Sequence, residues 1–577
     1  MVGRWYSQHV YGRLVRGCIA IGVIGIVVGS ITGLILPREA DAQFADDAVG
    51  VQGSVGFSGQ AYTAQGISNR DAPAQGEVFA DLSFNILGLS SGFSLDYSTD
   101  QSRLRQSSNE LNFNTSWSWG RVSAGSVTPS LSQFSMRGTT LRGGLVEISP
   151  GWLTLTMTAG EAQRAVGRTE GEFPRNPAFQ RMLYAGQVGV ESSSGETYLQ
   201  FVGVYAHDRE ESLDDPGDRV RPAENLTVTP QLGLSLFEGR VAFEGEATVS
   251  AMTRDVRNQP IDDFEVPLAT SVFTPRVGSQ VDYAGQSDLR FDFDVFTLDL
   301  GYSRVGPGFQ SLGVSRVRSD EETFSIDPTL QLFDRQLTVG MGFSQTRNNV
   351  RGHLNRTLTR RQVDTSVQAR FTTWVTLSGS YMRMSNLMER PDASPDQEDV
   401  SHTIMLSPTF TLRAGDVTHS ISLSGNYQTS GRQGEAAENG TSRAGEFDNT
   451  TGTVTYALNL PSGLSFNLSG NAARSSTGVS ENDLVGANLG AGYTFFNDAL
   501  QLNASGGWSS NESVTLRDGE ERVRRSTQLT GTLNSTYRLP NGDTIRFRLR
   551  GLSSDRSGRV ANNFQEMEAS LRYEHSF

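Results

Sequence analysis

The stretch Leu226-Thr227-Val228-Thr229-Pro230-Gln231-Leu232-Gly233-Leu234-Ser235-Leu236 decides the fold class of this chain. Its even positions are apolar and its odd positions are small or polar, an alternation typical of a β-strand with one apolar and one polar face. After a short break at 237–240, the alternation resumes in the opposite phase over residues 241–251. Because so short a connection leaves no room for a crossover, the two strands must be antiparallel neighbours in a hairpin.

The same hairpin unit recurs to the end of the chain. Short breaks flanked by alternating segments lie at 333–336, 371–374, 413–416, 461–463, 496–499 and 540–543. Long hydrophilic connectors, such as 429–449 and 509–525, separate the hairpins. Short turns at one end and long polar loops at the other predict an up-and-down antiparallel sheet.

The alternating segments predict about 26 strands, within a range of 22 to 26. An even number places both termini on the periplasmic side of a single-chain barrel. The predicted strands are 51–62, 78–86, 93–97, 111–119, 122–126, 142–149, 152–158, 182–191, 197–207, 226–236, 241–251, 285–294, 296–305, 322–332, 337–346, 362–371, 374–383, 402–413, 417–428, 450–460, 464–472, 484–495, 499–508, 526–539, 543–552 and 564–577.

A sheet this large, with no helices to cover its apolar face, should close on itself and face lipid. We therefore predict an all-β fold, a transmembrane antiparallel up-and-down β-barrel over residues 43–577 with short periplasmic turns and long extracellular loops. Pro230, Pro328 and Pro408 oppose this reading, since proline loses a ladder hydrogen bond. A β-bulge near each turn would accommodate them.

The composition is compatible with a barrel. The chain is 36% hydrophobic with a mean hydropathy of -0.35, and in a barrel only every second strand residue meets lipid. All 49 basic residues are arginine, against 63 acidic ones, for a net charge of -14. Arginine suits a charged lumen or a rim that faces lipopolysaccharide, although genome composition or a saline habitat is the plainer explanation. The acidic chain with no basic patch predicts no nucleic-acid partner.

Residues 1–42 have the features of a secretory signal peptide. Arginines precede an apolar run over 18–36, and Ala40 and Ala42 occupy the two positions that a signal peptidase reads. An uncleaved anchor helix is the alternative, since the run is nearly long enough to span a bilayer. Cys18 is the only cysteine, so a chain cleaved after Ala42 has no disulfide and no thiolate metal site.

The last segment, 567–577, has apolar or aromatic residues at most odd positions, including Tyr573, and ends in Phe577. Here the sequence resembles bacterial outer-membrane β-barrel proteins over about residues 51–577. The resemblance implies a location in the outer membrane, contact with its lipid and lipopolysaccharide, and a last strand that the barrel-assembly machinery reads. His575 departs from the apolar residue usual in that strand.

Charged residues alternate with the outward apolar ones in the last two strands. Arg546, Arg548 and Arg550 should face the lumen, and a connection over 553–563 should place Arg550 near Glu566 and Arg548 near Glu568, within a residue or two. Asp292, Asp294 and Asp299 should also point inward. Such pairs would fix the register of the strands, at roughly 0.2–1 kcal/mol each. The alternative role is a pore wall that selects solutes by charge.

Two further segments bear on function. Residues 128–141 break the alternation and are candidates for a segment folded into the lumen. Residues 88–92 match G-x-S-x-G but lie at a strand-to-strand turn, whereas a nucleophile elbow needs a strand-to-helix turn. His207-Asp208 is the only Asp/His pair of the kind that omptin proteases use near their outer rim. We therefore predict no enzyme activity, no cofactor and no metal site.

Two functions from different classes are compatible with these features. A barrel of this size encloses a lumen too broad for side chains to fill, which favours a wide channel or an export conduit across the outer membrane. The alternative is a structural or surface-display scaffold that binds a partner protein through loops near 208–222, 254–284, 385–400, 429–448 and 509–525, or at its periplasmic mouth.

Overall fold

A computed structural model describes residues 49–86, 89–99, 109–167, 177–214, 220–261, 272–390, 393–433, 446–517, 519–557 and 563–577. The predicted signal peptide and the residues Ala40 and Ala42 lie outside the described residues. The described part of the chain contains one short helical turn, η1 (Glu210–Ser212), and no helix long and apolar enough to cross a membrane.

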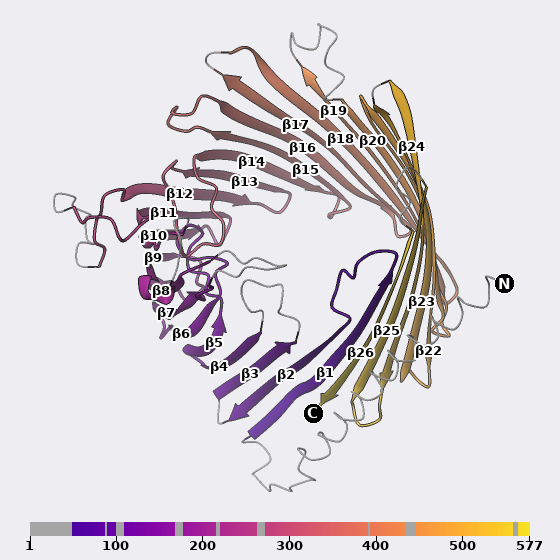
Figure 1. Cartoon of the computed structure of the whole chain (residues 1–577), viewed down its shortest axis with the longest axis horizontal. Helices are drawn as coiled ribbons and strands as arrows, with labels where there is room; N and C mark the ends of the chain where they lie inside the picture. Colours follow the sequence, from indigo (N-terminus) through magenta and orange to yellow (C-terminus); the bar gives the residue numbers. More distant parts are fainter. Residues whose placement is uncertain are drawn as a thin grey trace.

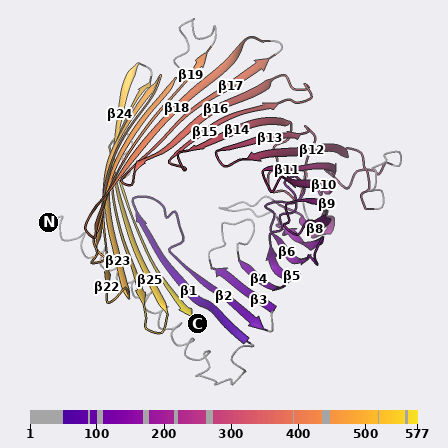
Figure 2. The same cartoon turned by 180° about the vertical axis from the view of Figure 1, so that it is seen from behind.

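The strands form one closed antiparallel ring of 26 members, each paired with its neighbours in sequence (Figures 1 and 2). This confirms both the predicted fold class and the predicted strand number. The strands are β1 (Val49–Gln65), β2 (Ala74–Ile86), β3 (Leu89–Ser98), β4 (Glu110–Trp117), β5 (Gly120–Val127), β6 (Leu141–Ile148), β7 (Leu153–Gln163), β8 (Gln180–Glu191), β9 (Tyr198–Arg209), β10 (Glu224–Leu236), β11 (Val241–Thr253), β12 (Gln280–Asp292), β13 (Phe296–Val305), β14 (Glu321–Leu332), β15 (Leu337–Asn348), β16 (Thr357–Thr372), β17 (Val375–Arg390), β18 (Ala393–Ala414), β19 (Val417–Gln433), β20 (Phe447–Asn459), β21 (Ser465–Thr477), β22 (Ser480–Phe495), β23 (Leu500–Arg517), β24 (Glu520–Arg538), β25 (Thr544–Ser557) and β26 (Phe564–Ser576).

The barrel closes between its first and last strands. β1 pairs with β26 from Ser54 opposite Ser576 to Gln65 opposite Gln565, without a register shift. Two backbone hydrogen bonds of 3.0 and 3.1 Å between Gly53 and Phe577 extend this ladder to the last residue. A closed ring leaves no unpaired strand edge, which is the condition for a sheet to span a membrane.

The two faces of the sheet differ as the alternation predicts. Along β10, Val228, Leu232 and Leu236 are exposed on the outer face, while Thr227 and Thr229 are fully buried on the inner face. The outward apolar side chains continue around the ring as a band that ends in aromatic residues at both edges. A sheet with this pattern is stable in lipid, because every second side chain meets hydrocarbon and every backbone group is paired.

One end of the barrel, which we call the turn side, carries the turns of the repeated hairpins. Three of these turns have the same shape: Phe237, Phe333 and Phe496 each begin a run of left-handed residues and accept a backbone hydrogen bond from the third residue after them. All three phenylalanines are more than 70% exposed. They form part of an aromatic edge of the kind that marks a membrane interface.

The prolines are accommodated without the predicted bulges. Around Pro230, the pairing of β10 with β11 stops at Val228 opposite Val249 and resumes at Gln231 opposite Glu246 in the same register. The ladders beside Pro328 and Pro408 are interrupted in the same way. The prediction of a bulge was wrong because a proline lacks only one donor, and a local gap in the ladder is enough to tolerate that loss.

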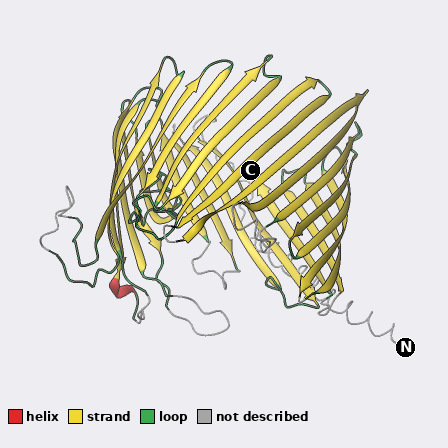
Figure 3. Cartoon of the chain, turned by 90° about the horizontal axis from the view of Figure 1, so that it is seen from above, coloured by secondary structure: helices red, strands yellow, loops and turns green. Residues whose placement is uncertain are grey.

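The opposite end, the loop side, also differs from prediction. The segments 385–400 and 509–525 were predicted as loops, but they form the ends of β17, β18, β23 and β24. Only two residues separate β17 from β18, and two separate β23 from β24. β18, β23 and β24 contain 22, 18 and 19 residues, and Figure 3 shows the tilted strands of the ring seen from above. The alternation fades there because neither face meets lipid.

Candidate functional site: the lumen of the barrel

One part of the lumen wall is covered by a second layer. The first inner segment, residues 128–140, and the second inner segment, residues 306–320, lie on the lumen face of β6–β13. Leu131, Met136 and Leu312 pack there against Leu183 and Val204. The buried lumen-facing residues of β6, β8 and β9 are mostly apolar, which is the reverse of the usual pattern in a barrel, whereas those of β10 and β11 include Thr227, Thr229 and Thr248. The core of the molecule is therefore inside the barrel, along one wall only.

The second inner segment extends this layer toward β13. Phe134 and Phe309 pack edge to face, with ring centroids 6.1 Å apart, and Ala284 and Val305 complete the cluster from the wall. Phe309 is 1% exposed. Edge-to-face pairs of this kind stabilise a core beyond the area that they bury.

Backbone hydrogen bonds join the two inner segments. Arg137 and Val314 form a parallel bridge, in which the Arg137 amide donates to the Gly313 carbonyl at 3.1 Å. The Ser315 amide donates to the Arg137 carbonyl at 3.2 Å. The Thr139 hydroxyl also donates to the Gly313 carbonyl at 3.0 Å, across 174 residues of sequence. The two segments thus form one structural unit.

Polar side chains on the wall hold this unit in place. The Gln231 amide donates to the Leu131 carbonyl at 2.8 Å, and the Asn225 side chain accepts from the Leu312 amide at 3.0 Å. Asn225 is 1% exposed. Because buried polar groups are costly unless they are hydrogen-bonded, these residues specify one position for the inner layer.

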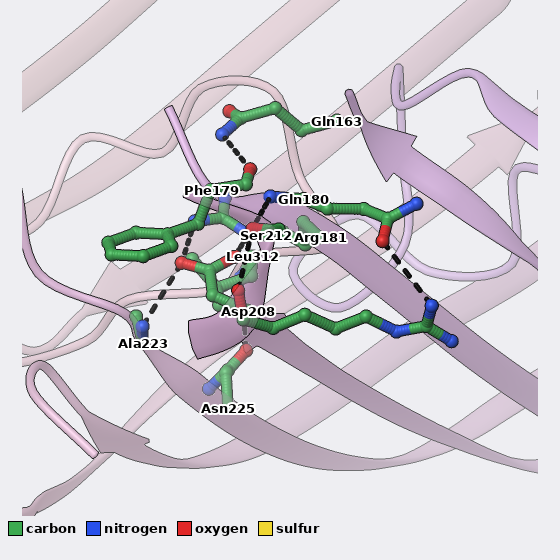
Figure 4. Close-up of polar contacts among 10 residues, drawn as sticks. Gln163, Phe179, Gln180, Arg181, Asp208, Ser212, Ala223, Asn225 and Leu312 are labelled. Atoms are coloured by element: carbon green, nitrogen blue, oxygen red, sulfur yellow. Dashed lines mark hydrogen bonds and ion pairs between the residues drawn. The ribbon is translucent and has the colours of Figure 1, made fainter. Parts of the chain in front are cut away.

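A buried ion pair closes the loop-side edge of the covered wall (Figure 4). Asp208 accepts from Nε and Nη2 of Arg181 at 2.8 and 3.0 Å and from the Ala223 amide at 3.0 Å. The Asp208 side chain is 3% exposed and that of Arg181 21%. The carboxylate is fully partnered, and it ties β8 and β9 to the connection that leads into β10.

A second buried carboxylate, Asp282, anchors the second inner segment. It accepts from the Gly308 amide at 2.6 Å and forms an ion pair with Arg351 from the connection between β15 and β16. A Cβ atom at Gly306 would lie 2.2 Å from the Asp282 carboxylate, so this close approach requires glycine. Asp282 therefore joins three parts of the chain at the loop side of the bore.

The other part of the wall has a single layer. In the part of the chain that the structure describes, no hydrogen bond joins the inner segments to β17–β26. The lumen positions of these strands carry serine, threonine and asparagine, such as Ser378, Asn467, Asn503 and Thr530. A polar wall of this kind is stable only in contact with water or with other polar groups.

Of the predicted lumen charges on the last two strands, some face each other and some do not. Arg546 donates to Glu574 at 2.6 Å. The register places Arg550 opposite Glu568 and Arg548 opposite Ser570, two residues from the central prediction and at the limit of its stated tolerance. β25 extends to Ser557, so the connection begins later than the alternation indicated.

The remaining acids of this region have other partners. Glu566 accepts from the Tyr62 hydroxyl at 2.7 Å and pairs with Arg70 at 3.3 Å. Arg572 lies opposite Arg546, 3.7 Å from the centroid of the Phe79 ring and within 3.8 and 4.0 Å of Glu574 and Glu77. Within the described residues, Arg548, Arg550 and Glu568 have no ion pair.

The predicted aspartates lie near the turn between β12 and β13. Arg290 pairs with Asp292 at 3.1 Å and with Asp299 at 3.3 Å. Asp294 was predicted to point inward from a strand. That prediction was wrong, because β12 ends at Asp292 and Asp294 lies in the turn. The alternation could not locate the end of the strand, since Phe291, Phe293 and Val295 continue it into the turn.

An acidic row on the same wall was not predicted from the sequence. Glu244 lies opposite Asp288, Asp299 lies opposite Asp327, and Asp364 follows on β16. Each stands at an inward position of its strand, so the alternation itself was the available signal. Only the register shows that these carboxylates are neighbours across five strand pairs.

His207 and Asp208 do not form a shared site. His207 faces outward and stacks on Tyr184, with ring centroids 6.2 Å apart, while Asp208 faces the lumen. Successive residues of a strand point to opposite faces, so the pair cannot act on one substrate. Among the described residues there is no group of three or more His, Cys, Asp or Glu side chains that could hold a metal.

The C-terminal residues are tied to the turn side. The Tyr573 hydroxyl donates to Asp543 at 2.7 Å, and His575 forms a short hydrogen bond to the same carboxylate. Burial acts to raise the pKa of Asp543, but hydrogen bonds from Tyr573, His575 and Asn541 outweigh it and hold that pKa below its usual value. Phe577 remains 51% exposed.

Comparisons with known proteins identify a fold class only. No family model matches the sequence, and no curated protein is similar to it. Among solved structures, OccAB2 from Acinetobacter baumannii is 12% identical, with 62% of this chain and 92% of that chain covered and a TM-score of 0.29. The outer membrane protein opdK from Pseudomonas aeruginosa is 13% identical, with 62% and 94% covered and a TM-score of 0.30. OccK2 (OpdF) from the same organism is 14% identical, with 62% and 92% covered and a TM-score of 0.31.

At these identities and TM-scores we infer nothing about this chain from those proteins. Its own strand pairing, apolar outer band and polar lumen face are sufficient for the architecture. A closed sheet whose outer face suits hydrocarbon and whose inner face suits water is stable only across a membrane. The chain is a transmembrane β-barrel of 26 strands.

Proposed function

We propose that the barrel is a wide channel or export conduit across the outer membrane. The observation that supports this most strongly is the position of the two inner segments. Both pack along β6–β13, and their hydrogen bonds go to that wall. A plug would need contacts on opposite walls, because a ring of 26 strands is too broad for one layer of side chains to fill.

The single-layer wall supports the same proposal. Its lumen side chains are small and polar, and many are exposed, including Ser378 and Thr530. A wall built to receive a tightly packed plug would bury larger or apolar side chains, as β8 and β9 do beneath the inner segments. The bore next to β16–β26 is therefore suited to water and hydrophilic solutes.

The charges of the lumen favour weak ion selectivity. The acidic row lies on β11–β16, and the arginines of β25 and β26 lie on a distant part of the ring. Charges in water are screened over about 8–10 Å at physiological ionic strength. In a wide bore the two groups act separately, so solutes in the centre meet little net field.

The proposal is tested by single-channel recording of the purified protein in planar bilayers. We expect a large conductance that increases in proportion to salt, with small differences between cations and anions. Neutral polyethylene glycols small enough to enter the bore should reduce it. The absence of conductance in correctly folded protein would overturn the proposal.

A second candidate function is a surface-display scaffold, and one observation favours it. β18 and β24 contain 22 and 19 residues, more than the 9–11 that a tilted strand needs to cross a membrane. The hairpins of β17–β18 and β23–β24 therefore project beyond the apolar band on the loop side. Shortening these two hairpins should abolish binding of a surface partner and leave conductance unchanged if display is the function.

A further inference from the structure

A row of arginines lies on the outer surface of the barrel, immediately above the apolar band. On β15 the outward residues Val339, Met341 and Phe343 are followed toward the loop side by Gln345 and Arg347. On β16 and β17, the first outward residues beyond the apolar ones are Arg361 and Arg383. The change from apolar to cationic occurs on three adjacent strands, one outward position nearer the turn side on each successive strand from β15 to β17.

The register brings these three arginines together. Arg361 lies opposite Gln345, one outward position from Arg347, and Val363 lies opposite Arg383, one outward position from Arg361. Neighbouring strands are about 4.8 Å apart. Three guanidinium groups thus project side by side into the region just outside the hydrocarbon layer.

Few acidic groups balance this charge. Glu322 lies opposite Arg347, accepts from the Tyr302 hydroxyl at 2.6 Å and is 4.0 Å from Arg304. Two further outward carboxylates lie nearer the loop side than Arg383: Glu389 near the end of β17, and Glu398 on β18, which accepts from Ser385. Arg361 donates to the neutral Gln345 at 3.0 Å. Within the described residues, Arg347 and Arg383 have no ion pair and no side-chain hydrogen bond.

Other arginines at the same level on the outer face are neutralised. Arg474 on β21 donates to Glu481 at 3.0 Å and lies 3.7 Å from Asp483. Arg525 on β24 pairs with Glu512 at 2.8 Å. The row on β15–β17 is therefore not a general property of the rim. Adjacent like charges on a sheet are destabilising unless another group compensates them.

Aromatic residues mark the membrane interface directly below the row. The Tyr381 hydroxyl and His402 Nδ1 are 2.9 Å apart on the outer face of β17 and β18, and Tyr302 lies on the outer face of β13, in register with Gln345. Tyrosine is enriched where hydrocarbon meets the head groups. The arginines therefore lie at the depth of the lipid phosphates in the leaflet on the loop side.

We propose that Arg347, Arg361 and Arg383 form a binding site for the phosphate groups of lipid A in lipopolysaccharide. Guanidinium groups bind phosphate oxygens through two parallel hydrogen bonds, which an ammonium group does not match. A lipid A molecule with its acyl chains along the apolar band places its phosphates at this level. The negative charge of its phosphates would also offset the repulsion among the three neighbouring guanidinium groups. The site is on the outer face, so it does not depend on what crosses the bore.

The experiment compares a triple variant, Arg347→Gln, Arg361→Gln and Arg383→Gln, with a matched control, Arg474→Gln, in which the lost arginine already has acidic partners. Each full-length protein is refolded, checked for the heat-dependent gel shift of an intact barrel, and titrated with bis-phosphorylated lipid A. We expect the triple variant to bind at least about tenfold more weakly than the wild type, because three charge-assisted contacts are lost. The control should bind like the wild type.

Three further measurements make the proposal falsifiable. Dephosphorylated lipid A should bind the wild type and the triple variant equally and weakly, and inorganic phosphate at the same concentration should not displace the lipid. If the triple variant does not fold, Arg361→Gln alone should weaken binding severalfold. Equal lipid A binding by folded variant and wild type would overturn the proposal, as would binding of dephosphorylated lipid A to the wild type as tightly as the bis-phosphorylated form. Displacement by inorganic phosphate, or preferential binding of an acidic protein instead of lipid, would also contradict it.

Discussion

The wall formed by β6–β13 and the wall formed by β16–β26 belong to one sheet, but among the described residues only the first has a second layer of chain on its lumen face. The first has a buried lumen face beneath the inner segments, with apolar residues such as Leu183 and hydrogen-bonded polar ones such as Asn225. The second is apolar outside and has a polar lumen face, of which residues such as Ser378 are exposed. The comparison indicates that burial of the lumen face, and not its polarity alone, shows whether a second layer covers it.

The two walls also use charge differently. Asp208 and Asp282 on the covered wall are buried and fully partnered, and they hold connections in place. On the single-layer wall, pairs such as Arg474 with Glu481 are more than half exposed. Buried pairs are strongly destabilising when one partner is removed, whereas exposed pairs contribute little. The covered wall should therefore be the more sensitive to substitution.

The largest expected effect is at the buried ion pair. Asp208→Ala leaves the mostly buried Arg181 without its carboxylate and removes the acceptor of the Ala223 amide. We expect a loss of about 3 kcal/mol in the free energy of unfolding, measured by urea titration in detergent or lipid. Asp483→Ala on the single-layer wall, whose side chain is 52% exposed, should cost at most about 0.5 kcal/mol. Equal losses would contradict the distinction between the walls.

A smaller effect is expected from a cavity beneath the inner segments. Leu183 is 0% exposed and packs in the cluster with Met136 and Val204. Leu183→Ala should cost about 2–3 kcal/mol, since a cavity remains where the side chain was. Met382→Ala, at a lumen position of β17 outside that cluster, should cost less than about 1 kcal/mol. The same urea titrations measure both, and a Met382 variant as unstable as the Leu183 variant would indicate a second covered wall.

The smallest effect concerns pH and a turn of the single-layer wall. The pKa of Asp543 lies below its usual value of 3.8 because of its hydrogen bonds, so its charged form stabilises the folded state. This contribution is complete above the usual value and is lost as the pH falls through the lowered one. The stability difference between wild type and Asp543→Asn should therefore be constant near pH 7 and shrink in strong acid. A difference that does not change with pH would contradict this role.

The sequence predicted the strands well because each crosses the apolar band, where alternation between two unlike faces is obligatory. It failed where that constraint is absent. The extensions of β17, β18, β23 and β24 are rich in polar residues, with only a few apolar ones such as Leu387, Val514 and Val523, so they resembled loops. The prolines were misjudged because sequence does not show which side of the ladder each would interrupt.

The inner layer was only partly visible in the sequence. Residues 128–141 stood out because they break the alternation, but 306–320 did not, since its glycines and serines resemble any surface loop. The pairing of Arg137 with Val314 spans distant parts of the chain, and no local pattern encodes it. The acidic row and the arginines of β15–β17 likewise depend on register, which the alternation leaves undetermined.

The asymmetry of the bore is tested most directly by the accessibility of single cysteines on the two walls. In a Cys18→Ser background, which contains no other cysteine, Thr229→Cys lies beneath the inner segments and Ser378→Cys lies on the single-layer wall. Thr229 is 0% exposed. We predict that a bulky water-soluble maleimide labels Ser378→Cys rapidly in the folded protein, and Thr229→Cys at least about a hundredfold more slowly. Equal labelling of the two positions, fast or slow, would contradict a bore that is covered on one wall and open along the other.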